Sequence, residues 1–159
     1  MSEKDVVCCP QFNPVSWDSK IFEWDDKKFV KESVRTFFNI PMNFGSVLKK
    51  IMKKAEGTDA ISSDFLCLTE HTSKWNMDIY LAVNEVIGDL DNTTISGNFY
   101  SKVYEGSFGN TKKWCEDYKL QTEKVGLNIS KTYNWYTTCP KCVKKYGKNY
   151  VTIVGKISK

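Results

Sequence analysis

The sequence predicts an α+β fold in which a β-α-β-β unit occurs twice and builds an antiparallel sheet system with two helices. Two stretches have helical hydrophobic spacing, and each is preceded by one β-like segment and followed by two. Corresponding elements of the two copies are separated by a nearly constant number of residues, which indicates an internal repeat. The paired starting points are Phe44 and Thr111, Asp64 and Lys131, and Asp78 and Asn149. Neither copy could bury its apolar face alone, so the two are expected to pack together.

The chain length suits one domain with a substantial core. We take residues 1–159 as that domain, with repeat units at about 21–92 and 93–159. Hydrophobic residues make up 41% and charged residues 26%, which is typical of globular proteins. The N-terminus has no apolar leader segment, and the longest apolar runs, such as Ile79–Val83, are too short to cross a membrane. We therefore expect a cytoplasmic protein with no membrane partner.

The charge of the chain does not indicate nucleic-acid binding. The net charge is +4, but of the 23 basic residues only Arg35 is an arginine. Bidentate recognition of phosphate or guanine favours arginine over lysine. The lysines are spread along the chain apart from a cluster at Lys141–Lys148, so a solvated surface is the expected role and no nucleic-acid partner is predicted.

The first unit follows an N-terminal arm without a clear period, which Trp17 is expected to anchor. Alternating apolar residues then cover residues 21–40, and the charged stretch from Trp24 to Lys28 predicts a turn between two short strands. A helix is predicted next, with Asn43 as its N-cap and Gly57 just past its end. Its apolar positions at helical spacing are Phe44, Val47, Leu48, Ile51, Met52 and Ala55.

The remaining elements are two strands of the first unit and the whole second unit. The second helix is predicted over Thr111–Val125, with Gly126 as its stop and Trp114, Cys115, Tyr118 and Val125 turned inward. The predicted strands are Asp64–Glu70, Met77–Val83, Thr93–Glu105, Ile129–Thr138 and Tyr150–Ile157. Turns are expected at Thr72–Asn76 and Gly106–Asn110, and a linker at Glu85–Asn92.

Aromatic residues make up 14% of the chain, more than a core of this size requires. Tyrosine and tryptophan recur on the predicted strands where leucine or valine would fill a core equally well, which favours a pocket for a flat apolar ligand. The alternative is a bulky core with tyrosine hydroxyls at its edge. The candidate ligand-binding residues are Trp75, Tyr80, Tyr100, Tyr104, Tyr133, Trp135 and Tyr136.

Two glutamates at strand ends are the candidate catalytic acids. Glu105 precedes Gly106, and Glu70 precedes His71, the single histidine of the chain. Either carboxylate could activate water if burial raised its pKa, although a solvated strand end is the simpler interpretation. Asp78 is a third, weaker candidate. One histidine excludes a multi-histidine metal site, and no nucleophile-elbow motif accompanies it, so His71 is interpreted as a turn residue.

Four of the six cysteines are candidate ligands of a metal ion. Cys139 and Cys142 form a CxxC pair, and Cys8 and Cys9 are the one other pair that could complete a tetrahedral zinc site. Adjacent cysteines are poor joint ligands, so two reduced pairs without metal are the alternative. The remaining cysteines, Cys67 and Cys115, are expected in the core. No cofactor is required by the sequence, and structural zinc is the one candidate.

A family resemblance rests mainly on the second unit. Val103–Phe108 precedes the helix that stops at Gly126, and Trp135-Tyr136, Pro140 and the closing strand follow. With the duplicated layout, these features resemble the gyrase-inhibitor-like (GyrI-like) small-molecule-binding domain over about residues 27–157. The stretches CCPQFNPVSW, FFNIPMNFG and YTTCPKCVKKYGKNYV further resemble a stand-alone branch of that family.

The resemblance implies a GyrI-like effector-binding fold with a ligand cleft between the two repeat units. Some stand-alone relatives look like hydrolases of strained electrophilic toxins, so the implied function is binding of a flat aromatic or electrophilic xenobiotic, with or without hydrolysis. The family usually has a glutamate two residues before the tyrosine that Tyr136 matches, and here Asn134 replaces it. This departure puts recognition of cationic ligands in doubt. The alternative function is a zinc-stapled protein-interaction module without enzymatic activity.

Overall fold

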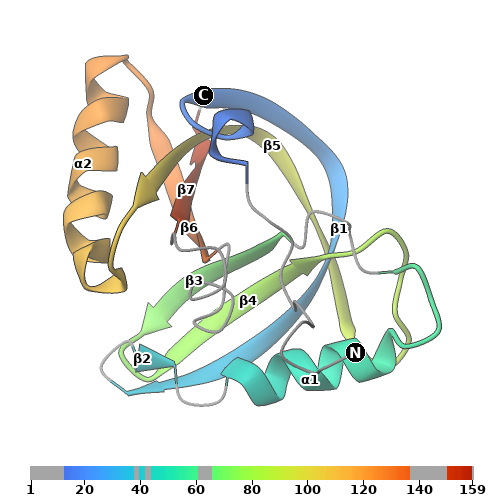
Figure 1. Cartoon of the computed structure of the whole chain (residues 1–159). Helices are drawn as coiled ribbons and strands as arrows, with labels where there is room; N and C mark the ends of the chain where they lie inside the picture. The colour runs from blue at the N-terminus through green and yellow to red at the C-terminus, as the bar shows by residue number, and fades with distance from the viewer. Residues whose placement is uncertain (1–12, 38–39, 42–43, 61–65, 137–149, 159) are drawn as a thin grey trace. The chain divides into compact units, whose positions relative to one another are not determined.

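The computed structural model describes residues 13–37, 40–41, 44–60, 66–136 and 150–158 (Figure 1). The chain divides into two compact units. The first unit is Trp24–Ser96, and the second unit combines Gly97–Lys159 with the N-terminal Met1–Glu23. Strands β1 (Lys20–Phe37) and β5 (Asp91–Glu105) contribute residues to both units.

The first unit is an antiparallel sheet with one helix. Its other elements are β2 (Ile40–Pro41), α1 (Phe44–Lys54), β3 (Cys67–Ser73) and β4 (Asn76–Ala82). Strand β1 pairs with the short β2 at its end and with β4 along its length, and β4 pairs with β3. The turn between β3 and β4 contains Lys74 and Trp75, within the turn that the sequence predicts.

One face of the strands in the first unit supplies its core. Apolar residues of β1, β3 and β4 point to the side of the sheet that α1 covers, because side chains in a strand alternate between the two faces. The helix contributes Ile51 and Ala55, which are buried as the helical spacing predicts. The strand residues of this core are Val30, Val34, Cys67, Met77, Ile79 and Leu81.

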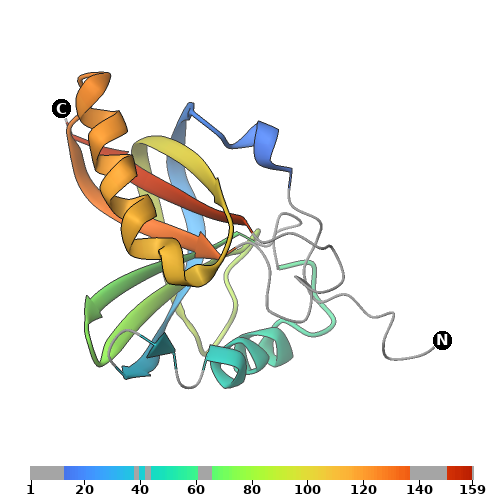
Figure 2. The same cartoon turned by 60° about the vertical axis from the view of Figure 1, so that its left-hand side comes forward.

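The second unit has the same order of elements. It contains the 3-10 helix η2 (Pro14–Ser16), β5, a 3-10 turn η3 (Phe108–Asn110), α2 (Thr111–Lys124), β6 (Ile129–Tyr136) and β7 (Tyr150–Ile157). Strand β7 pairs with β5 on one side and with β6 on the other, all antiparallel. In the first unit β4 lies between β1 and β3, and in the second unit β7 lies between β5 and β6. Helix α2 covers one face of this sheet (Figure 2).

The end of α2 is set by local chemistry. The Gly126 N–H donates to the Glu123 carbonyl at 3.1 Å, and the Leu127 N–H donates to the Thr122 carbonyl at 2.9 Å. This pair of bonds is a Schellman motif, which requires a left-handed residue after the helix. Gly126 has φ of +75° and meets that requirement without a Cβ clash, as the sequence predicts.

The predicted turn at Trp24–Lys28 is wrong, because β1 continues through it as one strand. The strand has a local irregularity at Asp26, whose φ is +49°. The Asp26 N–H donates to Ser96 Oγ at 2.7 Å, and the same hydroxyl donates back to Asp26 Oδ1 at 3.1 Å. A partner 70 residues away thus stabilises a conformation that the local sequence alone would end as a turn.

Three side chains expected in the interior are exposed. Cys115 on α2 and Val125 just past its end are exposed, and Met52 on α1 is 40% exposed. The buried stripe of α2 is narrower than predicted and consists of Trp114, Tyr118 and Thr122. Cys67 is buried as predicted. The predicted N-cap Asn43 and strand start Asp64 lie outside the described residues, and no described helix is long and apolar enough to cross a membrane.

Candidate functional site

The predicted ligand-binding aromatics of the second unit divide between the two faces of its sheet. Tyr100 and Tyr104 pair with Gly155 and Val151 of β7, which places them on the side that α2 covers. Tyr133 and Trp135 pair with Val154 and Thr152, which places them on the opposite side. These four residues therefore do not line one common wall within this unit. The side chain of Tyr136 lies outside the described residues.

On the α2 side, both tyrosines pack against the helix. Tyr100 lies against Tyr118 with 5.8 Å between ring centroids, and Tyr104 stacks on Trp114 at 5.8 Å and 18°. The Tyr104 hydroxyl donates to Asp117 Oδ2 at 2.7 Å. Burial and then this carboxylate raise the pKa of Tyr104 above its usual value. Tyr100 and Tyr104 are thus engaged in attaching α2 to the sheet.

Five aromatic residues lie on the opposite side, and we call them the aromatic face: Trp17, Phe22, Phe99, Tyr133 and Trp135. Trp17 meets Trp135 edge to face at 5.0 Å, and it meets Phe22 in the same way at 5.4 Å. Phe22 stacks on Phe99 at 5.8 Å. Tyr133 and Trp135 are only 5% and 3% exposed. The indole of Trp135 is therefore covered by Trp17, the residue predicted to anchor the N-terminal arm.

An open groove of about 210 Å³ lies at the same side of this sheet, and it contains the predicted acid Glu105. Glu105 and Tyr150 are cross-strand partners at the ends of β5 and β7. The groove is lined by Pro14, Val15, Asp18, Val103, Glu105 and Tyr150. It therefore brings two carboxylates, one phenol and three apolar side chains together within the second unit.

The N-terminal segment is held in place along β5 by two hydrogen bonds, and a third bond shapes the segment itself. Asn13 Oδ1 accepts from the Val15 N–H at 3.2 Å and begins the 3-10 helix. The Trp17 carbonyl accepts from the Ser101 hydroxyl, and Asp18 Oδ1 accepts from the Val103 N–H at 3.1 Å. Asp18 thereby binds a backbone donor of β5 and forms one wall of the groove.

A buried hydroxyl lies near this groove. Thr152 is fully buried, and its Oγ1 has no hydrogen-bond partner in the described part of the chain. Its register partners are Val103, which lines the groove, and Trp135 of the aromatic face. An unpaired buried hydroxyl is uncommon in proteins.

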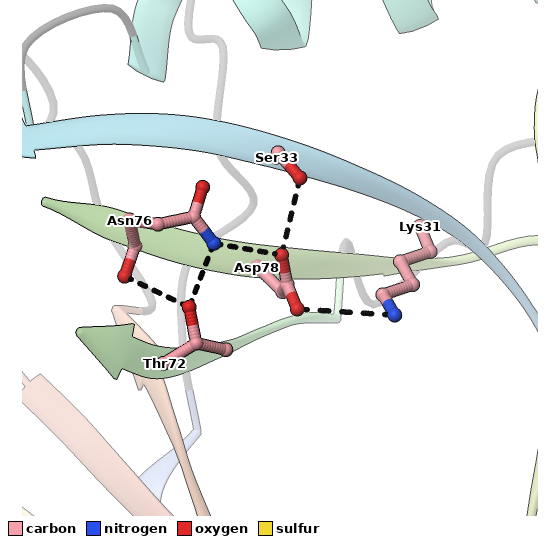
Figure 3. Close-up of polar contacts among 5 residues, drawn as sticks. All are labelled: Lys31, Ser33, Thr72, Asn76 and Asp78. Atoms are coloured by element: carbon pink, nitrogen blue, oxygen red, sulfur yellow. Dashed lines mark hydrogen bonds and ion pairs between the residues drawn. The ribbon is translucent and has the colours of Figure 1, made fainter.

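The other predicted acid, Glu70, lies in the first unit on the side of the sheet opposite α1. Its cross-strand partner is Asp78, which is 9% exposed. Asp78 Oδ1 accepts from Ser33 Oγ and from Asn76 Nδ2, both at 3.2 Å, and Lys31 Nζ lies 3.8 Å from Oδ2 (Figure 3). Because Asp78 is surrounded by donors, it is less available as a base than a carboxylate in an open groove.

The predicted aromatics of the first unit differ in exposure. Trp75 lies in the β3–β4 turn, is 56% exposed and packs edge to face against Phe37 at 5.7 Å. Tyr80 is 7% exposed, and Lys31 Nζ lies 5.7 Å from its ring centroid. None of the residues that line the described grooves comes from this unit.

His71 belongs to the core side of the first unit. It pairs with Met77, and its Nδ1 is buried without a hydrogen-bond partner among the described residues. Burial lowers the pKa of His71, so the neutral imidazole is favoured. A strand position facing the core replaces the turn position that the sequence predicts.

The metal hypothesis concerns residues that the structure does not describe. Cys8, Cys9, Cys139 and Cys142 all lie outside the described ranges. Within those ranges, no group of three histidine, cysteine, aspartate or glutamate residues is placed to hold a metal ion. The two described free cysteines are Cys67 and Cys115.

Two groups near these sites were not predicted from the sequence. Asp18 and Lys31 occupy segments with no chemical motif, and each acquires its role from a partner on a distant strand.

A second groove, of about 250 Å³, lies between α2 and the sheet and contains Cys115, Tyr118 and Ile153. None of the predicted site residues lines it.

Comparisons with known proteins provide a family and a fold. The model of a family described as "Bacterial hydrolase" matches residues 1–157. The crystal structure of the EcmrR C-terminal domain superimposes with a TM-score of 0.71 at 12% sequence identity, covering 90% of this chain and 98% of that domain. No curated protein matches the sequence. The structural likeness, at this identity, concerns the fold.

Proposed function

The chain belongs to the family described as bacterial hydrolase, and we propose that it binds a small electrophilic molecule with a flat apolar part and hydrolyses it in the Glu105 groove. The observation that carries this proposal is that Glu105 shares one open groove with Asp18, Tyr150 and three apolar side chains. Ligand sites typically combine apolar walls with a few convergent polar groups.

Each group in the groove has a distinct chemical role in this proposal. Glu105 lines the groove at the end of β5, where its carboxylate can accept a proton from a water molecule that attacks the electrophilic carbon. The Tyr150 hydroxyl donates a hydrogen bond to the oxygen or other atom that leaves that carbon. The leaving atom gains a proton from solvent, and Glu105 returns its proton to solvent, so the enzyme is regenerated.

Asp18 serves as a positioning residue in the same scheme. Its carboxylate is bound to the Val103 N–H, which fixes the N-terminal segment beside β5. Pro14 and Val15 then form the apolar wall that the flat part of a substrate would contact. Replacing Asp18 should weaken substrate binding through loss of this wall.

The proposal also uses the resemblance to GyrI-like small-molecule-binding domains. We infer that the two units are copies of one β-α-β-β unit and that the chain is a stand-alone member of that broader group. The shared strand order of the two units and the fold likeness to the EcmrR C-terminal domain support this inference. The predicted small-molecule ligand is consistent with it.

The test is hydrolysis of a panel of neutral electrophiles, comprising aryl epoxides, aryl esters and activated cyclopropanes, in ¹⁸O-labelled water. Glu105→Gln should lower turnover about 100-fold or more, the usual contribution of a general base. Glu123→Gln, an exposed residue of α2, is the matched control and should leave turnover unchanged.

Glu70→Gln distinguishes the two predicted acids. If Glu70→Gln abolishes turnover and Glu105→Gln does not, the reacting groups belong to the first unit. If the panel binds without ¹⁸O incorporation at any concentration of protein, the chain is a binding protein for these compounds and the hydrolytic part of the proposal is wrong.

A further inference from the structure

A lysine of the first unit lies between an aromatic ring and a carboxylate of the neighbouring strand. Lys31 on β1 pairs in register with Tyr80 on β4, and Asp78 is two residues before Tyr80, on the same face. The Lys31 ammonium is 5.7 Å from the Tyr80 ring centroid and 3.8 Å from Asp78 Oδ2. Figure 3 shows the Lys31 side chain directed towards that oxygen.

A ring face and a carboxylate arranged in this way form a binding site for a cation. A cation within about 6 Å of an aromatic centroid is attracted by the ring, more strongly when both are shielded from water. Tyr80 is 7% exposed, and the Asp78 side chain is 13% exposed. Both groups are therefore largely shielded from water, and a positive charge beside the Asp78 carboxylate offsets the cost of burying it.

The carboxylate is oriented by its neighbours, independently of the lysine. Ser33 Oγ and Asn76 Nδ2 both donate to Oδ1, so Oδ2 remains for the cation. Asn76 Nδ2 also donates to Thr72 Oγ1 at 2.7 Å, and that hydroxyl donates to the Asn76 carbonyl at 3.3 Å (Figure 3). This network holds Asp78 in position whether or not Lys31 is present.

We propose that Tyr80 and Asp78 form an organic-cation site that the chain fills with its own Lys31 ammonium. The side chain of Lys31 is 39% exposed and is the one member of the cluster attached by a long flexible stem. While it occupies the site, this face of the first unit accepts neutral or anionic groups and excludes organic cations. Lys31 is then the residue that determines charge specificity, and this inference does not depend on hydrolysis in the Glu105 groove.

The experiment removes the Lys31 side chain beyond Cβ and supplies the removed fragment as a free molecule in solution. Lys31→Ala removes three methylenes and the ammonium, which together correspond to n-propylammonium. We expect n-propylammonium to raise the Tm of Lys31→Ala in a saturable manner, with half-saturation at about tenfold lower concentration than any effect on the wild type. Equal concentrations of sodium chloride and of 1-propanol, the neutral analogue, should not reproduce this shift.

Two lysine variants serve as matched controls. Lys31→Met removes the charge but keeps a stem over the ring, so n-propylammonium should act on it as weakly as on the wild type. Lys27 lies 5.9 Å from the Trp24 ring and forms no ion pair within the described part of the chain. Lys27→Ala should therefore show no saturable response, because its ring lacks the carboxylate.

The role of the carboxylate is tested by the double variant Lys31→Ala with Asp78→Asn, which should lose the response. If the wild type, Lys27→Ala or the double variant responds like Lys31→Ala, the proposal is wrong.

A measurement on the folded wild-type chain covers the case that a variant does not fold. After reductive ¹³C-methylation of the lysines, the Lys31 methyl resonance should lie upfield of the other lysines, and a Lys31 resonance at the free-lysine position would also overturn the proposal.

Discussion

The indole of Trp17 meets the indole of Trp135 edge to face, with 5.0 Å between centroids and 81° between planes. This contact joins the N-terminal segment to β6 of the second unit. The hydrogen bonds from Ser101 to the Trp17 carbonyl and from the Val103 N–H to Asp18 strengthen the same attachment. The segment that forms one wall of the Glu105 groove is therefore part of the second unit.

Trp17→Ala should lower the free energy of unfolding by about 2 kcal/mol, less than for a fully buried tryptophan because Trp17 is half-buried. Limited proteolysis should then cleave residues 13–19 faster than in the wild type. Val15→Ala is the control, because Val15 is 75% exposed and its loss should change stability by less than about 0.5 kcal/mol. Equal stability of Trp17→Ala and Val15→Ala would contradict the anchoring role.

Gly155→Ala should destabilise the second unit by about 1–3 kcal/mol, the usual effect of overpacking. A Cβ at this position would collide with the Tyr118 hydroxyl and would lie 2.8 Å from Ile129 Cγ2. The same hydroxyl donates to the Tyr100 carbonyl at 2.7 Å, so it cannot move away freely. Gly88→Ala has no heavy atom within 4 Å of the new methyl group and should be nearly neutral in urea denaturation. An unchanged free energy of unfolding for Gly155→Ala would show that α2 can shift from the sheet at little energetic cost.

Stability should fall as the pH rises above about 10, the ordinary pKa of tyrosine. Burial is the main cause that raises the pKa values of Tyr104 and Tyr118, so the folded chain retains protons that the unfolded chain releases. The contribution of these two tyrosines to the free energy of unfolding is complete below pH 10, and it is lost as the pH approaches their raised pKa values. Tyr104→Phe should make the alkaline decrease in the urea midpoint shallower. An unchanged pH profile would contradict a buried, protonated Tyr104.

Zinc binding by Cys8, Cys9, Cys139 and Cys142 stays a prediction. If these four thiolates share one ion, protein purified without added metal should contain about one zinc per chain, and a chelator should lower the Tm. Cys115→Ser, which changes an exposed described cysteine, should leave the zinc content unchanged. Substoichiometric zinc in elemental analysis would mean that these cysteines are ordinary thiols.

Local signals in the sequence predicted most helices and strands. Helix α2 begins at Thr111 and ends before Gly126, and β7 covers Tyr150–Ile157, all as predicted. Helical spacing, strand alternation and a glycine that accepts a left-handed conformation all act between residues close in the chain. Cys115 and Val125 are exposed rather than buried, because the width of the buried stripe of a helix depends on what packs against it.

The candidate site was predicted less completely. Glu105 was identified from its strand-end position, but its groove partners Asp18 and Tyr150 were not, because they come from segments far away in the sequence. The interpretation of the aromatics as one ligand wall did not anticipate that Tyr100 and Trp135 lie on opposite faces of one sheet. A shift of one residue in register would exchange the faces, and strand register is not encoded in any single strand.

The sequence by itself determined the kind, order and approximate bounds of the elements, because hydrophobic period and capping are properties of neighbouring residues. Only the tertiary structure decided that β1 continues through Asp26, that Asp18 binds β5 and that Lys31 lies over Tyr80. Each of these contacts joins residues that are distant in the chain, and its formation depends on strand pairing. The Glu105 groove and the Lys31 contact therefore depend on strand pairings that become definite only when the sheet of each unit has formed.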